Sequence, residues 1–246
     1  MYIQRPLISH LNKNQKFSSE LRKMETMNLP DIQDIRTRVD AIEVLKYRNA
    51  LRYQYLICGR VSEVCGKYGP MGTDASIIEV NGEEAILFPV KTAKRGGKIR
   101  PVMLPLQYDP WARALAGWFE HKGKGRAFPM CMRSLQRFAS KVFEGLSYPI
   151  EKYYKPNKVE VPAHWKDMCT HALRHIRALQ DLMCFYGFDG LDLAIYGGWS
   201  SQFVESQLPK IASRYLHLIG NDTNTKLLTS LAKKYFPKLC RFQTWS

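Results

Sequence analysis

Two side chains in the second half of the chain, His171 and Arg174, have the residue types and the spacing of an anion-binding pair. Residues three apart on a helix are neighbours on its surface, so the imidazole and the guanidinium should project together. Both stand in the first turn of a predicted helix, where the N-terminal end of the helix dipole adds positive potential. The pair is therefore expected to form a preorganised anion site.

The helix that must carry this pair is predicted to run from about His171 to Tyr186. Thr170 is a good N-cap residue, and Gly187 suits the C′ position. At 100° per residue, one side carries Leu173, Ile176, Gln180 and Met183, and nearly opposite lie His171, Arg174, His175 and Ala178. The first of these sides is expected to face a core.

Two other interpretations of this segment remain open. His171 and His175 have the i, i+4 spacing of a zinc pair, but the glutamate of an HExxH motif is missing. The polar residues are also compatible with an ordinary capped surface helix. Elsewhere the six cysteines never form CxxC, which favours reduced, mostly buried thiols over a zinc or disulfide framework. We predict no metal and no other cofactor.

The charge of the chain is strongly positive and unevenly distributed. Its 246 residues hold 37 Lys and Arg against 22 Asp and Glu, a formal net charge of +15. Residues 91–100 carry five cations and residues 121–143 carry six, with no acidic residue in either stretch. Such clusters suit a surface that tracks phosphates. The charge favours nucleic acid first and an anionic membrane second, although a merely basic surface is an alternative.

Composition restricts the class of protein. An apolar fraction of 45% can bury a core, and no apolar run approaches the roughly 18 residues of a membrane span. The N-terminus lacks the apolar segment and cleavage site of a signal peptide, so we expect a cytoplasmic protein. Its charge adds the expectation that it is DNA-associated, with no membrane contact.

The elements expected to position the cations are mainly helical. Strands are predicted at Ser76 to Val80, Ala85 to Lys91 and Ile99 to Leu104, with turn signals at Asn81-Gly82 and Gly96-Gly97. Helices are predicted at 39–58, 111–121, 134–144, 208–218 and 225–236, besides the one at 171–186. A polar, proline-bearing connection is expected between Gly145 and Asp167. The predicted fold class is α+β, mainly helical with a small three-stranded antiparallel sheet.

Four segments, in their order along the chain, resemble the boxes of the tyrosine recombinase (phage-type integrase) family. CGRVSEV resembles its first arginine box, FPVKTAKRGGKIRPVMLPL its β-hairpin, HALRH its HxxR box and IYGGWSS its Gly-His/Trp box. The resemblance covers roughly residues 31–220 and implies the catalytic domain of that family. Residues 1–30 would then be a basic arm, and residues 221–246 a tail helix that packs on its own core or docks on a neighbouring subunit.

The resemblance assigns a role to individual residues. The catalytic set would be Arg60, Lys91, His171, Arg174, Trp199 and Tyr215, with Glu63 supporting Arg60. Tyr215 follows Trp199 at a longer interval than the family usually has, so Tyr235 remains an alternative nucleophile. Lys94 and Lys98 remain alternatives to Lys91, because a slip in strand register would change which side chain faces DNA.

The chemistry of this set is coherent. Arginine forks can offset charge on the non-bridging oxygens of a pentacoordinate phosphorus. A lysine among other cations can protonate the leaving 5′-oxygen, and His171 could accept the tyrosine proton. The indole N–H of Trp199 can donate one hydrogen bond to the phosphate.

The predicted function is that of a site-specific DNA recombinase or integrase that acts through a 3′-phosphotyrosine without metal or ATP. Alternatives are a type IB topoisomerase-like or telomere-resolving strand transferase, and a non-catalytic DNA-binding relative. The partner would be double-stranded DNA, on which a homo-oligomer assembles. Residues predicted to contact DNA are Lys94, Arg95, Lys98, Arg100, Lys122, Lys124 and Arg126. The chain would be either a catalytic domain cut from a longer protein or a short-form enzyme.

Overall fold

The computed structural model describes residues 30–80, 82–93, 98–150 and 164–178, together with 181, 182, 186, 188, 192 and 196–198. The described helices are α2 (Ile32–Asp40), α3 (Leu45–Leu56), α4 (Val61–Val64), α5 (Pro110–Lys122), α6 (Met132–Val142) and α7 (Thr170–Ile176), with a 3₁₀ turn η1 (Gly72–Asp74). The strands are β1 (Ser76–Val80), β2 (Glu83–Lys91), β3 (Ile99–Pro105), β4 (Ser147–Ile150) and β5 (His164–Asp167). The fold is α+β, as predicted.

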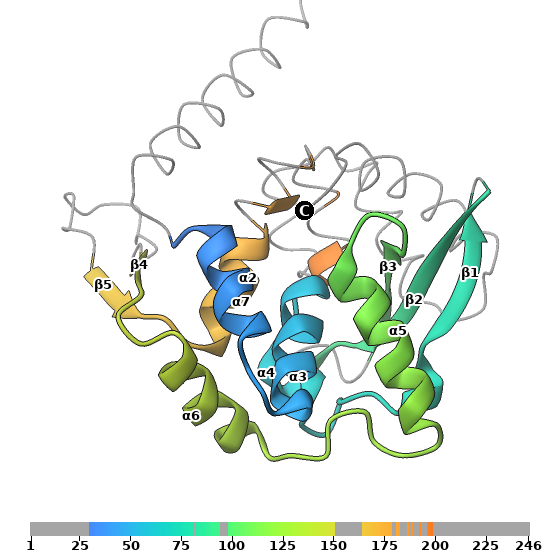
Figure 1. The fold of residues 1–246 in the computed structure, drawn as a ribbon, viewed down its shortest axis with the longest axis horizontal. Helices are drawn as coiled ribbons and strands as arrows, with labels where there is room; N and C mark the ends of the chain where they lie inside the picture. The colour runs from blue at the N-terminus through green and yellow to red at the C-terminus, as the bar shows by residue number, and fades with distance from the viewer. Residues whose placement is uncertain are drawn as a thin grey trace, which may run out of the picture.

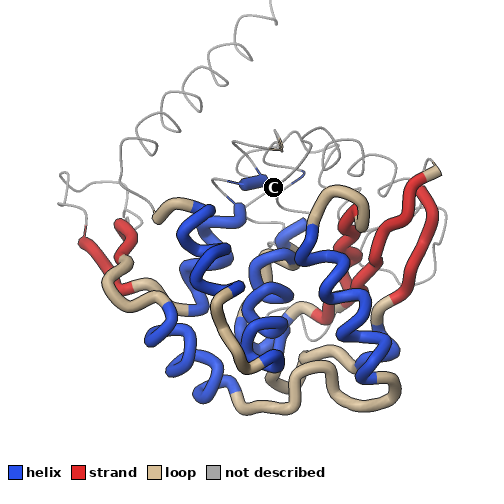
Figure 2. Tube along the Cα trace, in the orientation of Figure 1, coloured by secondary structure: helices blue, strands red, loops and turns tan. Residues whose placement is uncertain are grey.

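The elements are arranged around α3. Figure 1 shows α2 and α7 on one side of α3, with α5 and the three-stranded sheet on the other. The two sheets lie at opposite edges of the described fold (Figure 2). None of the helices in these ranges is long and apolar enough to cross a membrane. Except for Pro30, the expected arm (1–30), the tail (221–246) and the predicted helices at 208–218 and 225–236 lie outside the described residues.

The three-stranded sheet agrees with its prediction. The strands pair antiparallel in the order β1-β2-β3, and the register sets Ser76 opposite Leu87 and Lys91 opposite Ile99. Gly82 has a φ of +82°, the left-handed conformation that a tight turn requires and glycine adopts readily. The alternation of strand side chains buries Phe88 and Val90 and leaves Lys91 partly exposed at the end of β2.

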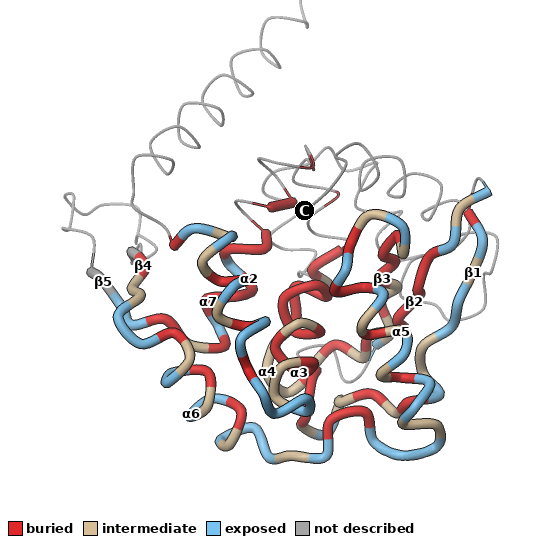
Figure 3. The backbone as a smooth tube through the Cα atoms, viewed as in Figure 1, coloured by how far each residue is buried: buried red, intermediate tan, exposed pale blue. Residues whose placement is uncertain are grey.

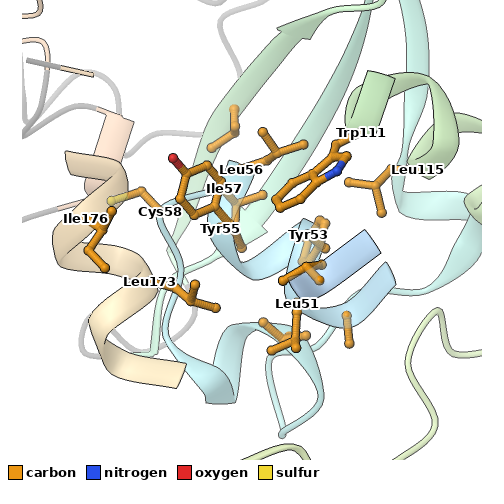
Figure 4. Packing of buried hydrophobic residues seen from close by; sticks show 14 of the residues in the cluster. Leu51, Tyr53, Tyr55, Leu56, Ile57, Cys58, Trp111, Leu115, Leu173 and Ile176 are labelled. Carbon is orange, nitrogen blue, oxygen red and sulfur yellow. The ribbon is translucent and has the colours of Figure 1, made fainter. Parts of the chain in front are cut away.

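Helix α3 lies at the centre of the core. Its residues Leu51, Tyr53, Tyr55 and Leu56 are all at most 2% exposed. Figure 4 shows Trp111 and Leu115 of α5 packing near this group, with Leu173 and Ile176 of α7 nearby. From Asn49 to Leu56 every residue of α3 except Arg52 is buried, while Leu45 and Lys46 at its start are exposed. Figure 3 shows the same concentration of buried backbone at α3.

Two predictions of secondary structure were wrong in detail. The expected single helix at 39–58 is two helices, because the chain ends α2 at Asp40 and takes an extended conformation at Val44 before α3. The polar connection between Gly145 and Asp167 contains β4 and β5, which pair antiparallel from Ser147 opposite Asp167. Composition favoured a loop there, but tertiary packing buries Tyr148 to 6% exposure and so supports a strand.

Helix α7 begins one residue earlier than expected. Its N-cap residue is Cys169 and not Thr170, which is itself helical and 1% exposed. Leu173 and Ile176 are buried as predicted. The α-helix ends at Ile176, and residues 177, 178, 181 and 182 continue as π-helix, with the Tyr186 amide donating to the Asp181 carbonyl at 2.9 Å.

A buried ion pair fastens the segment after α7 to α3. The Arg177 guanidinium donates to Asp181 Oδ2, and the Tyr55 hydroxyl donates to the same oxygen at 2.9 Å. The Gln54 side chain adds a second tie, since its Nε2 donates to the Thr170 carbonyl at 3.0 Å. These contacts hold α7, and with it Arg174, against the C-terminal end of α3.

A second buried ion pair joins α2 to α5. Arg36 donates to both Asp109 oxygens, at 3.4 and 3.2 Å, and its guanidinium carbon lies 4.5 Å from the Trp111 ring centroid. Asp109 is also the N-cap of α5 and accepts from the Trp111 amide at 2.9 Å. One carboxylate therefore caps a helix and neutralises a buried cation.

We predict that Asp109→Ala lowers the free energy of unfolding by about 3–5 kcal/mol, because removing one partner leaves a buried charge uncompensated. The control, Asp34→Ala, breaks the Asp34–Arg38 pair, whose side chains are 40% and 34% exposed. Such a surface pair should contribute less than about 1 kcal/mol. Urea denaturation of both variants measures the difference, and equal losses would contradict the assigned role of Asp109.

Candidate functional site

The buried carboxylate of Glu63 is the junction of the candidate site. Arg60 is the N-cap of α4, and Glu63 is the third residue of that helix. The Arg60 amide donates to Glu63 Oε2 at 3.0 Å, and Arg60 Nη1 donates to Oε1 at 3.1 Å. The Ala93 amide donates to Oε1 at 3.1 Å, and Arg100 Nη2 donates to Oε2 at 3.4 Å. The side chain of Glu63 is 0% exposed, so these donors replace its water.

The surroundings keep Glu63 ionised. Burial alone would raise the pKa of the carboxyl, but the charge of Arg100 and the amides of Arg60 and Ala93 outweigh it, and the pKa is lowered from its ordinary value. Glu63 therefore carries a negative charge that offsets neighbouring guanidiniums. The ion pair between Arg60 and Glu63 is present, and its support of a catalytic Arg60 stays a prediction.

Arg174 lies close to this junction. It is 4% exposed, and it donates from Nη1 to the Cys58 carbonyl at 2.7 Å and from Nη2 to the Gly197 carbonyl at 2.9 Å. Burial, together with the positive charges of Arg100 and Arg60, lowers the pKa of Arg174 to about 10. The side chain remains a cation at neutral pH. Arg60 and Arg174, distant in sequence, thus belong to one cluster of charge.

The burial of Arg174 differs from its expected place on the polar side of the helix. Leu173, Arg174 and Ile176 are all buried, and so is Ala178. Helical periodicity identifies the apolar side but cannot show that a second segment, here residues 196–198, covers the opposite one. His171 and His175 do remain exposed.

The two histidines of α7 face each other. Their ring centroids are 4.7 Å apart with the rings nearly perpendicular, and the Tyr148 ring lies 6.4 Å from that of His175. Packing of protein atoms around the ring, and then the charges of His171 and Arg174, lower the pKa of His175 to about 4. Within the described ranges, no group of three His, Cys, Asp or Glu side chains is arranged to hold a metal ion.

Lys91 stands at the end of β2, where the hairpin begins. Its side chain is 43% exposed, and its Nζ lies 3.8 Å from Asp74 Oδ2. The Thr92 amide and hydroxyl both donate to the Lys98 carbonyl at 2.8 Å, which closes the loop between β2 and β3. Lys98 is exposed, while Lys94 and Arg95 lie outside the described residues.

The other predicted DNA contacts follow α5. Lys124 and Arg126 are exposed, and Arg126 Nη1 donates to the Gly66 carbonyl at 3.3 Å, close to α4. Lys122 is half-buried, with its Nζ 4.4 Å from the Trp118 ring centroid. Lys122 thus ends α5, and Lys124 and Arg126 lie on the loop after it, which contacts the segment following Glu63 through Arg126.

Arg100 does not occupy the surface position that was predicted for it. It is 3% exposed and donates from Nη2 to the Ile57 carbonyl at 2.8 Å. A signal for this was present in the strand pattern, because Arg100, Val102 and Leu104 share one face of β3 at a period of two. An apolar Val102 and Leu104 on this face predict that Arg100 also points inward. The assignment of Arg100 to the DNA-binding surface considered only its positive charge and did not use this pattern.

Trp199, Tyr215 and the alternative Tyr235 lie outside the described residues. Residues 196–198, immediately before Trp199, are described and contact the cluster through Gly197 and Arg174. Comparison with family models, with curated proteins and with solved structures finds no match to this chain. Any functional assignment therefore depends on the chemistry of the residues described above.

The lowered pKa of Glu63 predicts a pH dependence of stability. A carboxyl with a lowered folded pKa stabilises the fold fully above its ordinary value of 4.5 and loses that contribution as the pH falls through the folded value. The stability difference between wild type and Glu63→Gln should therefore be largest near neutral pH and decline below pH 4.5.

Urea denaturation at a series of pH values measures this difference. The control is Glu120→Gln, at an exposed position on α5, for which the difference should stay small throughout. A Glu63→Gln difference that grows as the pH falls would show that the carboxyl is not stabilised in its ionised form.

Proposed function

We propose that this protein cleaves and rejoins DNA through a 3′-phosphotyrosine, as a site-specific recombinase or integrase with the catalytic domain of the tyrosine recombinase family. The observation that carries the proposal is that Arg60 is bonded to the buried Glu63 while Arg174, bonded to the Cys58 carbonyl, lies close enough for its charge to interact with both. Two arginines from distant segments, each fixed by hydrogen bonds, form the kind of preorganised cationic centre that phosphoryl transfer requires.

Arg60 would contact the non-bridging oxygens of the scissile phosphate, and Arg174, which is 4% exposed and bonded to two carbonyls, would add positive charge close by. Negative charge on those oxygens grows as the phosphorus becomes pentacoordinate, and a planar fork can meet two of them at once. Since Glu63 and backbone carbonyls already hold Arg60 and Arg174, little reorganisation accompanies the reaction. Arg60 keeps 22% of its side chain exposed, which leaves part of its guanidinium accessible to a phosphate.

The proposed reaction balances with protein groups alone. The Tyr215 oxygen bonds to phosphorus while the bond from phosphorus to the 5′-oxygen breaks. His171 accepts the phenol proton, and Lys91 supplies a proton to the leaving 5′-oxygen. A 5′-hydroxyl of another strand reverses the step, so that no ATP is needed.

The hairpin and residues 196–198 support these roles by their contacts. Ala93, two residues after Lys91, donates its amide to Glu63, which ties the hairpin to the arginine centre. Gly197, two residues before Trp199, accepts from Arg174. The backbone next to Lys91 and the backbone next to Trp199 therefore both form hydrogen bonds with members of the Glu63–Arg174 charge cluster.

Double-stranded DNA is the proposed partner, and α6 offers a basic surface for it. Arg133, Arg137 and Lys141 recur at intervals of four along this helix, and all three are exposed. Leu135 and Ala139 bury the opposite side of α6. A row of cations on one helix face, with no acidic residue in the helix, is suited to contact phosphates of a DNA backbone.

The central test is a covalent adduct. Wild-type protein incubated with DNA that carries a nick beside the scissile bond should form a protein–DNA adduct, visible as a band in denaturing gels. Tyr215→Phe should abolish it because the attacking oxygen is lost, while Tyr68→Phe, the matched control, should not. Arg60→Lys should slow adduct formation by roughly 100-fold, the effect of losing one such donor.

Other outcomes distinguish the alternatives. Adduct formation that survives in Tyr215→Phe would transfer the role to another tyrosine, with Tyr235 the first to substitute. Relaxation of supercoils without strand exchange would favour a topoisomerase-like enzyme. DNA binding without any adduct on a suitable site would favour a non-catalytic relative.

The α6 surface predicts a salt dependence of binding. Each phosphate contact contributes about 0.9 to the slope of log affinity against log salt, so replacing Arg133, Arg137 and Lys141 by Gln should lower the slope by about 2–3. Fluorescence anisotropy with duplex DNA measures this slope.

Replacing Lys122, Lys124 and Arg126 by Gln tests the end of α5 and the loop after it in the same way, and Lys46→Gln on α3 is the control. An unchanged slope in the α6 variant would remove that helix from the DNA interface.

A further inference from the structure

Arg100 contacts three separate segments with one guanidinium. It lies on β3 and is buried, and its Nη2 donates to Glu63 Oε2 at 3.4 Å and to the Ile57 carbonyl at 2.8 Å. Its Nη1 donates to the Tyr196 carbonyl. The side chain therefore links α4, the turn after α3 and the segment that leads to Trp199.

Arg174 makes a parallel set of contacts one residue further along. Arg100 joins the carbonyls of Ile57 and Tyr196, while Arg174 joins those of Cys58 and Gly197. Two guanidiniums thus cross-link the same two backbone segments. Neither segment belongs to a strand that could pair with the other. The two guanidiniums therefore supply hydrogen-bond donors to buried carbonyls that no strand pairing satisfies.

Gly198 shows how closely this segment approaches Arg100. A Cβ on Gly198 would lie 2.6 Å from Arg100 Cδ and 2.9 Å from Thr92 Cγ2, and the φ of Gly198 is +61°. Both the space and the backbone conformation favour glycine. The backbone directly before Trp199 therefore packs against the aliphatic part of Arg100 and against Thr92, at the loop end of the β2–β3 hairpin.

We infer that Arg100 is a positioning residue, which orients Arg60 through Glu63 and fixes the backbone before Trp199, and that it does not contact DNA. This inference rests on the proposed function, since it assigns Arg100 a part in assembling that site. Its burial separates it from the exposed Lys98 on the same hairpin. Lysine cannot replace it, because one ammonium lacks the planar fork that reaches acceptors on opposite sides.

The electrostatics of Glu63 give an independent readout. Among the described residues, charged and titratable groups that interact with its carboxylate include Arg60, Arg100, Arg174, Tyr53 and Cys58. Burial raises the pKa of Glu63, and among the groups that lower it the charge of Arg100 has the largest effect. Removing that charge should therefore raise the pKa of Glu63 even where no DNA is present.

The experiment compares Arg100→Lys and Arg100→Gln with wild type. At saturating nicked DNA, both variants should form adduct about 100-fold more slowly, the scale of a misplaced reacting group, while the dissociation constant for DNA stays within about twofold. The matched control is Arg113→Lys on α5, since Arg113 is exposed and also bridges two carbonyls, of Leu106 and Gln107. This control should retain the wild-type rate.

The second measurement is a carbon-13 NMR titration of the glutamate carboxyls, in which Glu63→Gln identifies the Glu63 signal. Arg100→Gln should move the Glu63 titration to higher pH. A Glu63 signal that titrates in Arg100→Gln as it does in wild type overturns the inference. If Arg100→Gln does not fold, the rate of adduct formation and the DNA affinity of Arg100→Lys decide the test.

The outcomes separate this inference from the proposed function. A wild-type protein that forms no adduct contradicts the proposed function, and the Glu63 titration then decides the role of Arg100 alone. An adduct that forms at the wild-type rate in both Arg100 variants overturns the inference and leaves the function intact. Loss of DNA affinity with an unchanged rate at saturation would also overturn it, since it would indicate direct contact with phosphate.

Discussion

A single buried carboxylate holds together the parts of this fold that carry charge. Glu63 accepts hydrogen bonds from the start of its own helix, from the hairpin after β2 and from β3. Without that negative charge, Arg60, Arg100 and Arg174 would repel one another in a poorly solvated place. The carboxylate therefore makes a cluster of cations compatible with a folded protein, and it does so from a helix of only four residues.

The position of the arginine cluster is set by the packing of α3 in the core. The second half of helix α3 is buried except at Arg52, and the turn that follows it presents the carbonyls of Ile57 and Cys58 to two arginines. Gln54 and Tyr55, near the end of α3, fix the start of α7 and the buried Arg177–Asp181 pair. Polar groups inside the core thus place the elements, and apolar packing alone would not specify which carbonyl meets which guanidinium. The geometry of the site is a consequence of this polar interior.

The sequence predicted local features well and long-range ones poorly. The strands of the hairpin follow from alternation and turn residues, and α5 follows from Asp109, Pro110 and a periodic apolar pattern. The pairing of Arg60 with Glu63 could also be predicted, because the two residues are only three positions apart. The burial of Arg174 could not be predicted from its helix, because the segment that covers it comes from residues 196–198. Likewise β4 and β5 depend on each other across the intervening residues, and neither has a strong strand pattern alone.

The turn at Gly82 lies at the far end of β2 from Lys91. A Cβ added there would meet no atom within 4 Å, so the surroundings of this turn are open. The length of β2 separates it from the charged junction, and the ladder to β3 keeps the strand in register. Gly82 itself must remain glycine because its φ is +82°, but the exposed Glu84 beside it could carry a fluorophore or a surface tether without disturbing the charged interior.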